Sequence, residues 1–150
     1  MIQHIDVHAV LQESVSGVYT DLVTRPTGRV VRERIERAMA TAQDPVTVTR
    51  IDFTGVGCID YSCADEIVAK LLRDRRAVVV LSGISEGHRE AIEPVLAGHG
   101  LAALIERREG GNGELEALGA PEAAAALVDE LVARRLAVRT PAGTIALTLA

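Results

Sequence analysis

Six residues between positions 60 and 66 carry the side chains of this sequence that are best suited to chemistry. They are Asp60, Tyr61, Ser62, Cys63, Asp65 and Glu66. A serine at the start of a helix can cap that helix or carry a phosphate, because the free backbone N–H groups and the helix dipole stabilise negative charge there. We expect Ser62 to be the N-cap, a role that contributes about 1 kcal/mol. A phosphate on Ser62 is the alternative, and the neighbouring acids would repel it.

The cysteine and the acids of this stretch offer other chemistry. The helix dipole would lower the pKa of the Cys63 thiol, and the acidic neighbours would oppose that effect. Cys58 lies five residues upstream, a spacing that fits no zinc or redox motif, so we expect both cysteines to be small buried thiols. The carboxylates could hold magnesium, but no glycine-rich phosphate loop accompanies them. We therefore predict a protein that is not an enzyme and that holds no metal and no cofactor.

A strand, a turn and a helix must position these residues. The β-branched and mostly apolar run 46–53 predicts a buried strand, and the glycine-containing segment 54–57 predicts a tight turn. Asp65 follows Ser62 by three residues, close to a capping box, and a helix is predicted over 62–73. The apolar stripe of this helix is formed by Ala64, Ile67, Val68, Leu71 and Leu72.

The same stretch resembles the signature of STAS domains, the sulfate-transporter and anti-sigma-factor-antagonist family. The resemblance is carried by Ile51-Asp52-Phe53-Thr54-Gly55-Val56 followed by Ile59-Asp60-Tyr61-Ser62. It looks closest to a STAS-like branch of uncharacterised bacterial proteins, and it covers the segment 1–110. In anti-sigma-factor antagonists, the residue after the second aspartate is typically the serine or threonine that a partner kinase phosphorylates. The corresponding residue here is Tyr61.

The resemblance implies a cytoplasmic regulatory module that binds another protein. The implied partner is an ATP-binding kinase or an anti-sigma factor of the histidine-kinase-like ATPase superfamily. Docking would use the turn at Asp60 and the exposed face of the 62–73 helix. The partner-binding candidates are Asp60, Cys63, Asp65 and Glu66, and the phosphorylation candidates are Tyr61 and Ser62.

The rest of the first 110 residues repeats the strand-helix pattern. Strands are predicted over 2–11, 77–81 and 101–106, and helices over 27–42 and 86–97, while 15–23 fits helix or strand equally. Pro94 is expected to kink or split its helix. This repetition implies right-handed crossovers and a STAS-like α/β fold, a mixed and largely parallel sheet with flanking helices.

Two further groups of side chains could bind a ligand or could be ordinary structural residues. His4 and His8 share one face of the predicted strand and could bind a metal, but no third ligand is in sight. The arginines of the 27–42 helix, Arg29, Arg32 and Arg37, could form an anion site. We favour a solvated or satisfied histidine pair, and a charged outer helix face that Glu33 and Glu36 neutralise.

The segment 111–150 is predicted to be a C-terminal extension. The run 110–113 is a sharp turn signal, a returning antiparallel strand fits 114–118, and a helix opens at Pro121. A β-hairpin is predicted over 136–149, and its apolar strand Ile145-Ala146-Leu147-Thr148-Leu149 could pair with a second copy to form a homodimer. Assembly of this kind and small-ligand binding between sheet and helices are the alternative functions. The extension lacks the basic recognition helix that DNA binding needs.

Composition limits the partners. The net charge of −5 argues against nucleic acid, which requires clustered positive charge. No segment approaches the ~18 apolar residues of a membrane span, and no signal peptide is visible at the start. The 2 cysteines do not make a disulfide framework. We therefore expect a cytoplasmic protein with no membrane partner.

Overall fold

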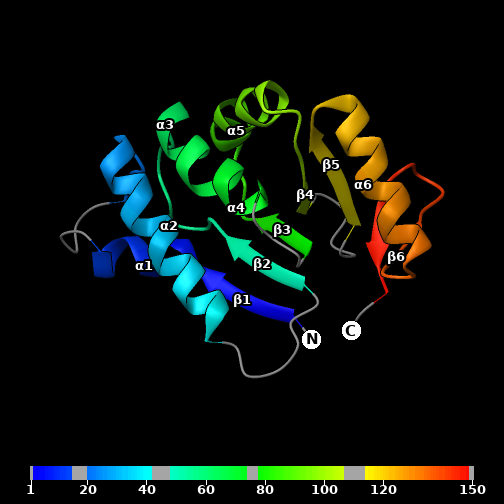
Figure 1. Ribbon diagram of the computed structural model, residues 1–150, viewed down its shortest axis with the longest axis horizontal. Coiled ribbons are helices and arrows are strands. Elements are labelled where there is room, and N and C mark those ends of the chain that lie inside the picture. The colour runs from blue at the N-terminus through cyan, green and yellow to red at the C-terminus, as the bar shows by residue number, and fades with distance from the viewer. Residues whose placement is uncertain (1, 15–19, 42–47, 74–77, 107–113, 149–150) are drawn as a thin grey trace.

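A seven-stranded sheet is the centre of the computed structural model, which describes residues 2–14, 20–41, 48–73, 78–106 and 114–148 (Figure 1). The strand order is β1-β2-β3-β4-β5-β7-β6. The strands are β1 (Ile2–Asp6), β2 (Val48–Asp52), β3 (Val78–Ser82), β4 (Ala102–Glu106), β5 (Glu114–Gly119), β6 (Ala137–Arg139) and β7 (Ile145–Leu147). β1 to β4 pair in parallel, and β5, β7 and β6 continue the sheet in antiparallel fashion. The predicted α/β class with a mixed, largely parallel sheet is confirmed.

The helices cover the two faces of this sheet unequally. They are α1 (Val7–Ser14), α2 (Arg25–Ala40), α3 (Tyr61–Ala64), the π-helical η1 (Asp65–Ala69), α4 (Lys70–Arg73), α5 (Glu86–Gly98) and α6 (Pro121–Ala133). The segments α3, η1 and α4 follow one another without a break and form one helix over 61–73. Because side chains alternate along a strand, Leu81 and Ile105 join the core under α2, the 61–73 helix and α5, whereas Val80 and Leu104 join a smaller core under α6.

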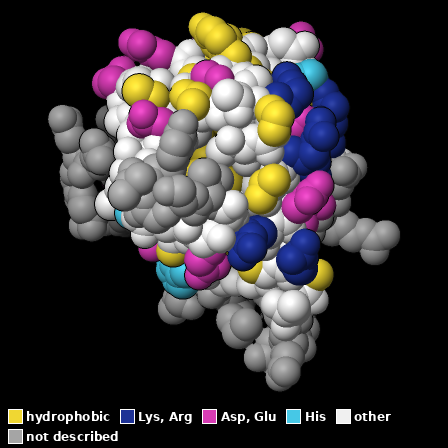
Figure 2. Space-filling model, turned by 90° about the vertical axis from the view of Figure 1, so that its left-hand side faces the viewer, with side chains coloured by type: hydrophobic (Ala, Val, Ile, Leu, Met, Phe, Trp, Pro, Cys, Tyr) yellow, Lys and Arg dark blue, Asp and Glu magenta, His cyan; other side chains and the backbone are white. Residues whose placement is uncertain are grey.

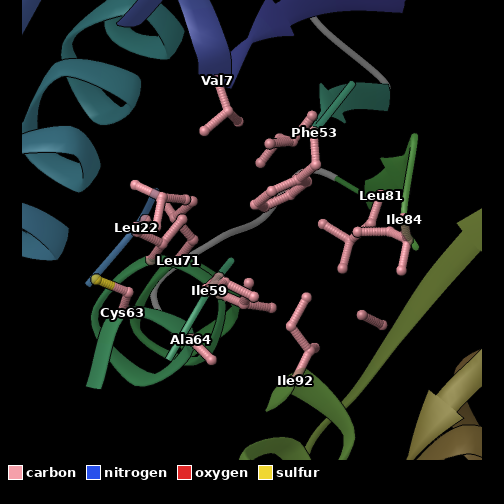
Figure 3. Close-up of a cluster of buried hydrophobic side chains, with 14 of the residues drawn as sticks. Val7, Leu22, Phe53, Ile59, Cys63, Ala64, Leu71, Leu81, Ile84 and Ile92 are labelled. Carbon is pink, nitrogen blue, oxygen red and sulfur yellow. The ribbon is translucent and has the colours of Figure 1, made fainter. Parts of the chain in front are cut away.

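The larger core is mostly aliphatic and surrounds the ring of Phe53, which also contacts the buried imidazole of His88. Phe53 is fully buried and lies among side chains from several elements (Figure 3). The labelled neighbours are Val7, Leu22, Ile59, Cys63, Ala64, Leu71, Leu81, Ile84 and Ile92. Truncating a buried phenylalanine to alanine typically costs about 3–5 kcal/mol, so Phe53 is the largest single contribution expected from one side chain of this core.

The predicted strand over 2–11 is wrong beyond Asp6, because α1 begins at Val7. Asp6 Oδ1 accepts the N–H of Ala9 at 3.1 Å, which caps this helix. Val7 and Leu11 are both fully buried, and their i, i+4 spacing suits a helix as well as an alternating strand. His8 therefore lies on α1 and does not share a strand face with His4. Among the described residues, no group of three metal-ligating side chains comes together.

Other predictions about the elements can be compared directly. α5 extends from Glu86 to Gly98 as one helix, so Pro94 does not split it. The returning antiparallel strand is confirmed as β5, which pairs with β4, and the C-terminal hairpin is confirmed as β6 and β7. These elements continue the same sheet as β1 to β4. The predicted turn at 110–113 lies outside the described residues.

The hairpin has a different exposed strand from the one expected. β7 lies between β5 and β6, so both of its edges are already paired, and β6 is the end of the sheet. The expectation that the strand starting at Ile145 is a free edge is therefore wrong. Within the described residues, no helix has the length and apolarity needed to cross a membrane.

Candidate functional site

Asp60 is the residue that organises the start of the 61–73 helix. Its Oδ1 accepts the N–H of Cys63 and the hydroxyl of Ser62, each at 2.8 Å. Its backbone is extended, with φ −92 and ψ 173, as an N-cap residue requires. The prediction that Ser62 is the N-cap is therefore wrong. The N-cap lies two residues earlier than expected, because the helix begins at Tyr61 and Asp60 is the residue before it.

The carboxylate of Asp60 also reaches a distant segment. Its Oδ2 accepts the N–H of Thr24 at 3.0 Å. Burial alone would raise the pKa of Asp60, but hydrogen bonds from the N–H groups of Cys63 and Thr24 and from the Ser62 hydroxyl hold it below its usual range. Asp60 is thus an ionised cap and a weak base. The hydroxyl of Ser62 faces an acceptor that is poorly suited to activate it as a nucleophile.

Residues 20–24, which we call the strap, lie against the turn that leads to Asp60. Leu22 donates its N–H to the carbonyl of Cys58 at 2.8 Å and accepts the N–H of Asp60 at 3.0 Å. Gly57 donates its N–H to the carbonyl of Thr20 at 2.7 Å, so strap and turn pair in parallel. The sequence did not distinguish helix from strand here, because a pairing of so few residues is too short to produce a periodic pattern.

Cys63 is fully buried beneath the strap. Its thiol donates to the carbonyl oxygen of Thr24 at 3.1 Å. Burial, followed by the negative charge of Asp60, raises the pKa of this thiol to about 12. A thiolate at Cys63 is thereby strongly disfavoured near neutral pH. Cys58 is exposed, so the expectation of two buried thiols is right only for Cys63, and both cysteines are free.

Glu66 is fully buried, whereas the sequence placed it on a docking surface. Its carboxylate accepts Arg25 at 3.0 Å and Lys70 at 2.8 Å, and Arg32 lies 3.5 Å away. Burial would raise its pKa, but these cations hold the pKa below its usual range. The cations come mainly from α2, which approaches closely because Gly28 has no side chain: a Cβ there would lie 3.1 Å from the Cα of Cys63 and from the Cβ of Glu66.

Asp65 is more accessible than Glu66 and faces a second set of partners. Arg25 donates to its Oδ2 at 2.7 Å, and His99 Nε2 lies 2.7 Å from its Oδ1. Burial opposes ionisation, yet these two contacts hold the pKa of Asp65 below its usual range. Arg73 also contacts His99, so the end of α5 is tied to the 61–73 helix. The sequence pattern did not single out Arg25 or His99, because their contacts arise only when α2 and α5 pack beside this helix.

The charged side chains of α2 form the outer surface of this region. On the face over α1 and α2, Lys and Arg side chains lie along one side with Asp and Glu among them (Figure 2). Arg32 pairs with Glu36, as expected for a neutralised helix face, and also with Glu66. Of the arginines considered for an anion site, Arg32 is therefore already committed to carboxylates.

A shallow depression of about 490 Å³, which is open to solvent over most of its extent and which we call the pocket, lies beside the start of the 61–73 helix. Its walls include Arg25, Tyr61, Ser62, Asp65, Val95 and His99. Tyr61 is 63 % exposed, one of the few large hydrophobic side chains on the described surface. The structure therefore brings both predicted phosphorylation candidates to this pocket, together with Asp65, and leaves Cys63 and Glu66 buried behind it. Another pocket, of about 460 Å³, lies between α6 and the strands β5 and β7.

No family model, curated protein or solved structure matches the chain. The fold itself defines an α/β protein with a mixed, largely parallel sheet. The site is defined by its own geometry: an ionised Asp60 that joins strap and helix, a buried Glu66 surrounded by cations, and an exposed Tyr61 at a pocket.

Proposed function

We propose that the chain is a regulatory protein-interaction module of STAS-like fold that docks a protein partner at the pocket beside Tyr61. The observation that carries the proposal is the 63 % exposure of Tyr61 at the first position of a well-anchored helix. Tyrosines are enriched at protein interfaces because they combine an apolar ring with a polar hydroxyl and lose little conformational entropy. By resemblance, the partner is a cytoplasmic kinase or anti-sigma factor of the histidine-kinase-like ATPase superfamily.

The surroundings of Tyr61 support docking because they are held in place before a partner arrives. Asp60 caps the helix, and Arg25 is fixed by Asp65 and Glu66 at 2.7 and 3.0 Å. A preorganised surface loses less entropy on binding than a flexible one. Val95 adds apolar surface, and Arg25, Asp65 and His99 add polar groups that can select the partner.

Phosphorylation would regulate this docking by changing the charge of the docking surface. The exposed Tyr61 is accessible to a kinase, and a phosphate there adds negative charge beside Arg25. The hydroxyl of Ser62 is half-buried and donates to Asp60, so a phosphate on Ser62 would first have to break that hydrogen bond. Tyr61 is therefore the candidate that the surface favours.

The test begins with capture of partners from the native cytosol by the tagged chain, with phosphosite mass spectrometry. Each captured protein is then purified, and its affinity is measured by calorimetry. Tyr61→Ala should weaken binding about tenfold or more, as expected for an exposed aromatic anchor. Val138→Ala is the matched control, because Val138 is 52 % exposed on β6. Equal affinities for wild type, Tyr61→Ala, Tyr61→Glu and Ser62→Asp would rule out docking at this pocket.

Assembly with a second copy is a second candidate, favoured by one observation. β6 is the last strand of the sheet, and its Val138 is exposed. An unpaired edge with an exposed apolar side chain can add a strand from another molecule. Light scattering after size-exclusion chromatography tests this candidate: a dimer that Val138→Lys dissociates supports it, and a wild-type monomer at high micromolar concentration contradicts it.

A further inference from the structure

Thr24 has a backbone conformation that a threonine rarely adopts. Its φ is 71 and its ψ is 142, close to a region that is almost restricted to glycine. Among the described residues, Arg135 is the other non-glycine residue with positive φ, but it follows the end of α6, where a left-handed residue is usual. Thr24 instead precedes α2 and is β-branched, so its conformation carries strain.

The contacts that hold Thr24 in this conformation come from the start of the 61–73 helix and from the first turn of α2. Its N–H donates to Asp60 Oδ2 at 3.0 Å, and its carbonyl accepts the thiol of Cys63 at 3.1 Å. Its carbonyl also accepts the N–H of Gly28 at 3.2 Å in the first turn of α2. Strain of this kind persists only where the surrounding structure over-determines the backbone. Here Asp60 supplies the ionic part of that restraint.

We propose that Asp60 and Thr24 form a strained clamp between the 61–73 helix and the strap, and that negative charge on residue 62 opens it. Ser62 Oγ lies 2.8 Å from Asp60 Oδ1, so an anionic group at this position stands against the Asp60 carboxylate. Repulsion at such a distance displaces the carboxylate. Thr24 then loses its acceptor, and its backbone relaxes to negative φ.

Opening of the clamp changes the mouth of the pocket, because Arg25 is the next residue. The guanidinium of Arg25 contacts Asp65 and Glu66, and a rotation of the backbone at Thr24 redirects the chain that carries it. The clamp thus converts a charge at residue 62 into a movement of the strap and of the first turn of α2. It operates within the isolated chain, so it can hold or fail independently of the proposed docking function.

The experiment measures amide hydrogen exchange and the ¹³C shifts of residue 24 by NMR in the purified full chain. The strap reporter is the N–H of Leu22, which donates to Cys58 and not to the Asp60 side chain. Ser62→Asp should accelerate exchange of this amide about tenfold or more and shift residue 24 toward ordinary extended backbone. Ser62→Ala, the matched neutral control, should leave both signals as in wild type.

A second pair of variants tests whether the strap is released by backbone strain at Thr24 or only by loss of a hydrogen bond. Asp60→Asn is made both in the wild-type chain and in Thr24→Gly. Asp60→Asn keeps the size of the side chain but replaces one acceptor oxygen by a donor, so it should release the strap in the same way. In Thr24→Gly, positive φ carries no strain, and Asp60→Asn should then leave the Leu22 amide protected. An unchanged strap in Ser62→Asp overturns the proposal, as does equal acceleration by Asp60→Asn in both backgrounds. Loss of amide protection at Leu81 in Asp60→Asn would show that this variant unfolds the chain. In that case the result for Ser62→Asp tests the proposal by itself.

Discussion

The thiol of Cys63 lies 3.1 Å from the carbonyl oxygen of Thr24, although 39 positions separate the two residues. Cys63 is buried beneath the strap, whereas Cys58 is exposed on the turn. The two thiols therefore differ in access to solvent. Burial is the main reason that the pKa of Cys63 rises to about 12, and the charge of Asp60 adds to it.

The first prediction concerns alkylation of the two cysteines. Iodoacetamide at pH 8 should modify Cys63 at least about a hundredfold more slowly than the exposed Cys58, because the thiolate is the reactive species and Cys63 is protonated and covered. Peptide mapping by mass spectrometry over time measures both rates. In denaturant the rates should become equal, which controls for local sequence effects. Comparable rates in the folded protein would contradict the buried position of Cys63.

The second prediction concerns the buried carboxylate of Glu66. Glu66→Gln removes the charge that Arg25, Arg32 and Lys70 share, and we expect it to lower the free energy of unfolding by about 2 kcal/mol. Urea denaturation provides the measurement.

Glu93→Gln is the matched control for this substitution. Glu93 is 49 % exposed, and its partner Arg89 is 3.6 Å away, so its loss should cost less than about 0.5 kcal/mol. Equal losses of unfolding free energy in the two variants would show that the buried Glu66 carboxylate stabilises the protein no more than an exposed one.

The third prediction follows from the lowered pKa values of Asp60, Asp65 and Glu66. Burial opposes ionisation of all three, but hydrogen bonds and cations hold each pKa below that of the unfolded chain. Their stabilisation is therefore complete above the unfolded values near 4 and is lost as the pH falls through the folded values. The free energy of unfolding should be flat from pH 7 to about pH 5 and should fall below that. Urea titrations at several pH values measure the fall, which should be shallower in Glu66→Gln.

The fourth prediction concerns Gly83, which follows β3. Its φ is 66, and a Cβ there would lie 2.4 Å from Thr54 Oγ1 and 2.6 Å from Asp52 Oδ1. Gly83→Ala should therefore cost about 2–3 kcal/mol through backbone strain and overlap. Gly98→Ala is the matched control, since Gly98 lies in α5 with no atom near the added methyl group. It should be neutral or slightly stabilising in thermal unfolding. Equal melting temperatures for both variants would refute this assignment of strain to Gly83.

The sequence was sufficient for elements whose pattern is long or whose turn chemistry is distinctive. The apolar run that became β3, the proline that opens α6 and the alternation over 114–118 that became β5 each produced the expected element. The failures share a different cause. Val7 and Leu11 satisfy both helical and extended spacing, so only tertiary packing could decide between them.

The sequence singled out the residues at the start of the 61–73 helix as candidates, but it did not predict the contacts that each of them makes. Asp60 and Ser62 are both good capping residues, and the choice depended on where the helix begins. The burial of Glu66 depends on Arg25 and Arg32, which lie in another helix 41 and 34 positions away in the chain, and on the close approach at Gly28. Local periodicity does not report on partners of this kind.

The order of the strands in the sheet has a consequence for how the chain reaches its native state. β1, β2, β3 and β4 are neighbours in the order of synthesis, and β5 follows β4. Each new strand can therefore add to the outer edge left by the previous one, although each connection between two parallel strands includes at least one helix. β7 lies between two strands that both precede it in the chain, and it can reach this position together with β6 as a hairpin. Among the described strands, none has to insert singly into a sheet that has already formed, so the sheet can grow progressively from its N-terminal strands.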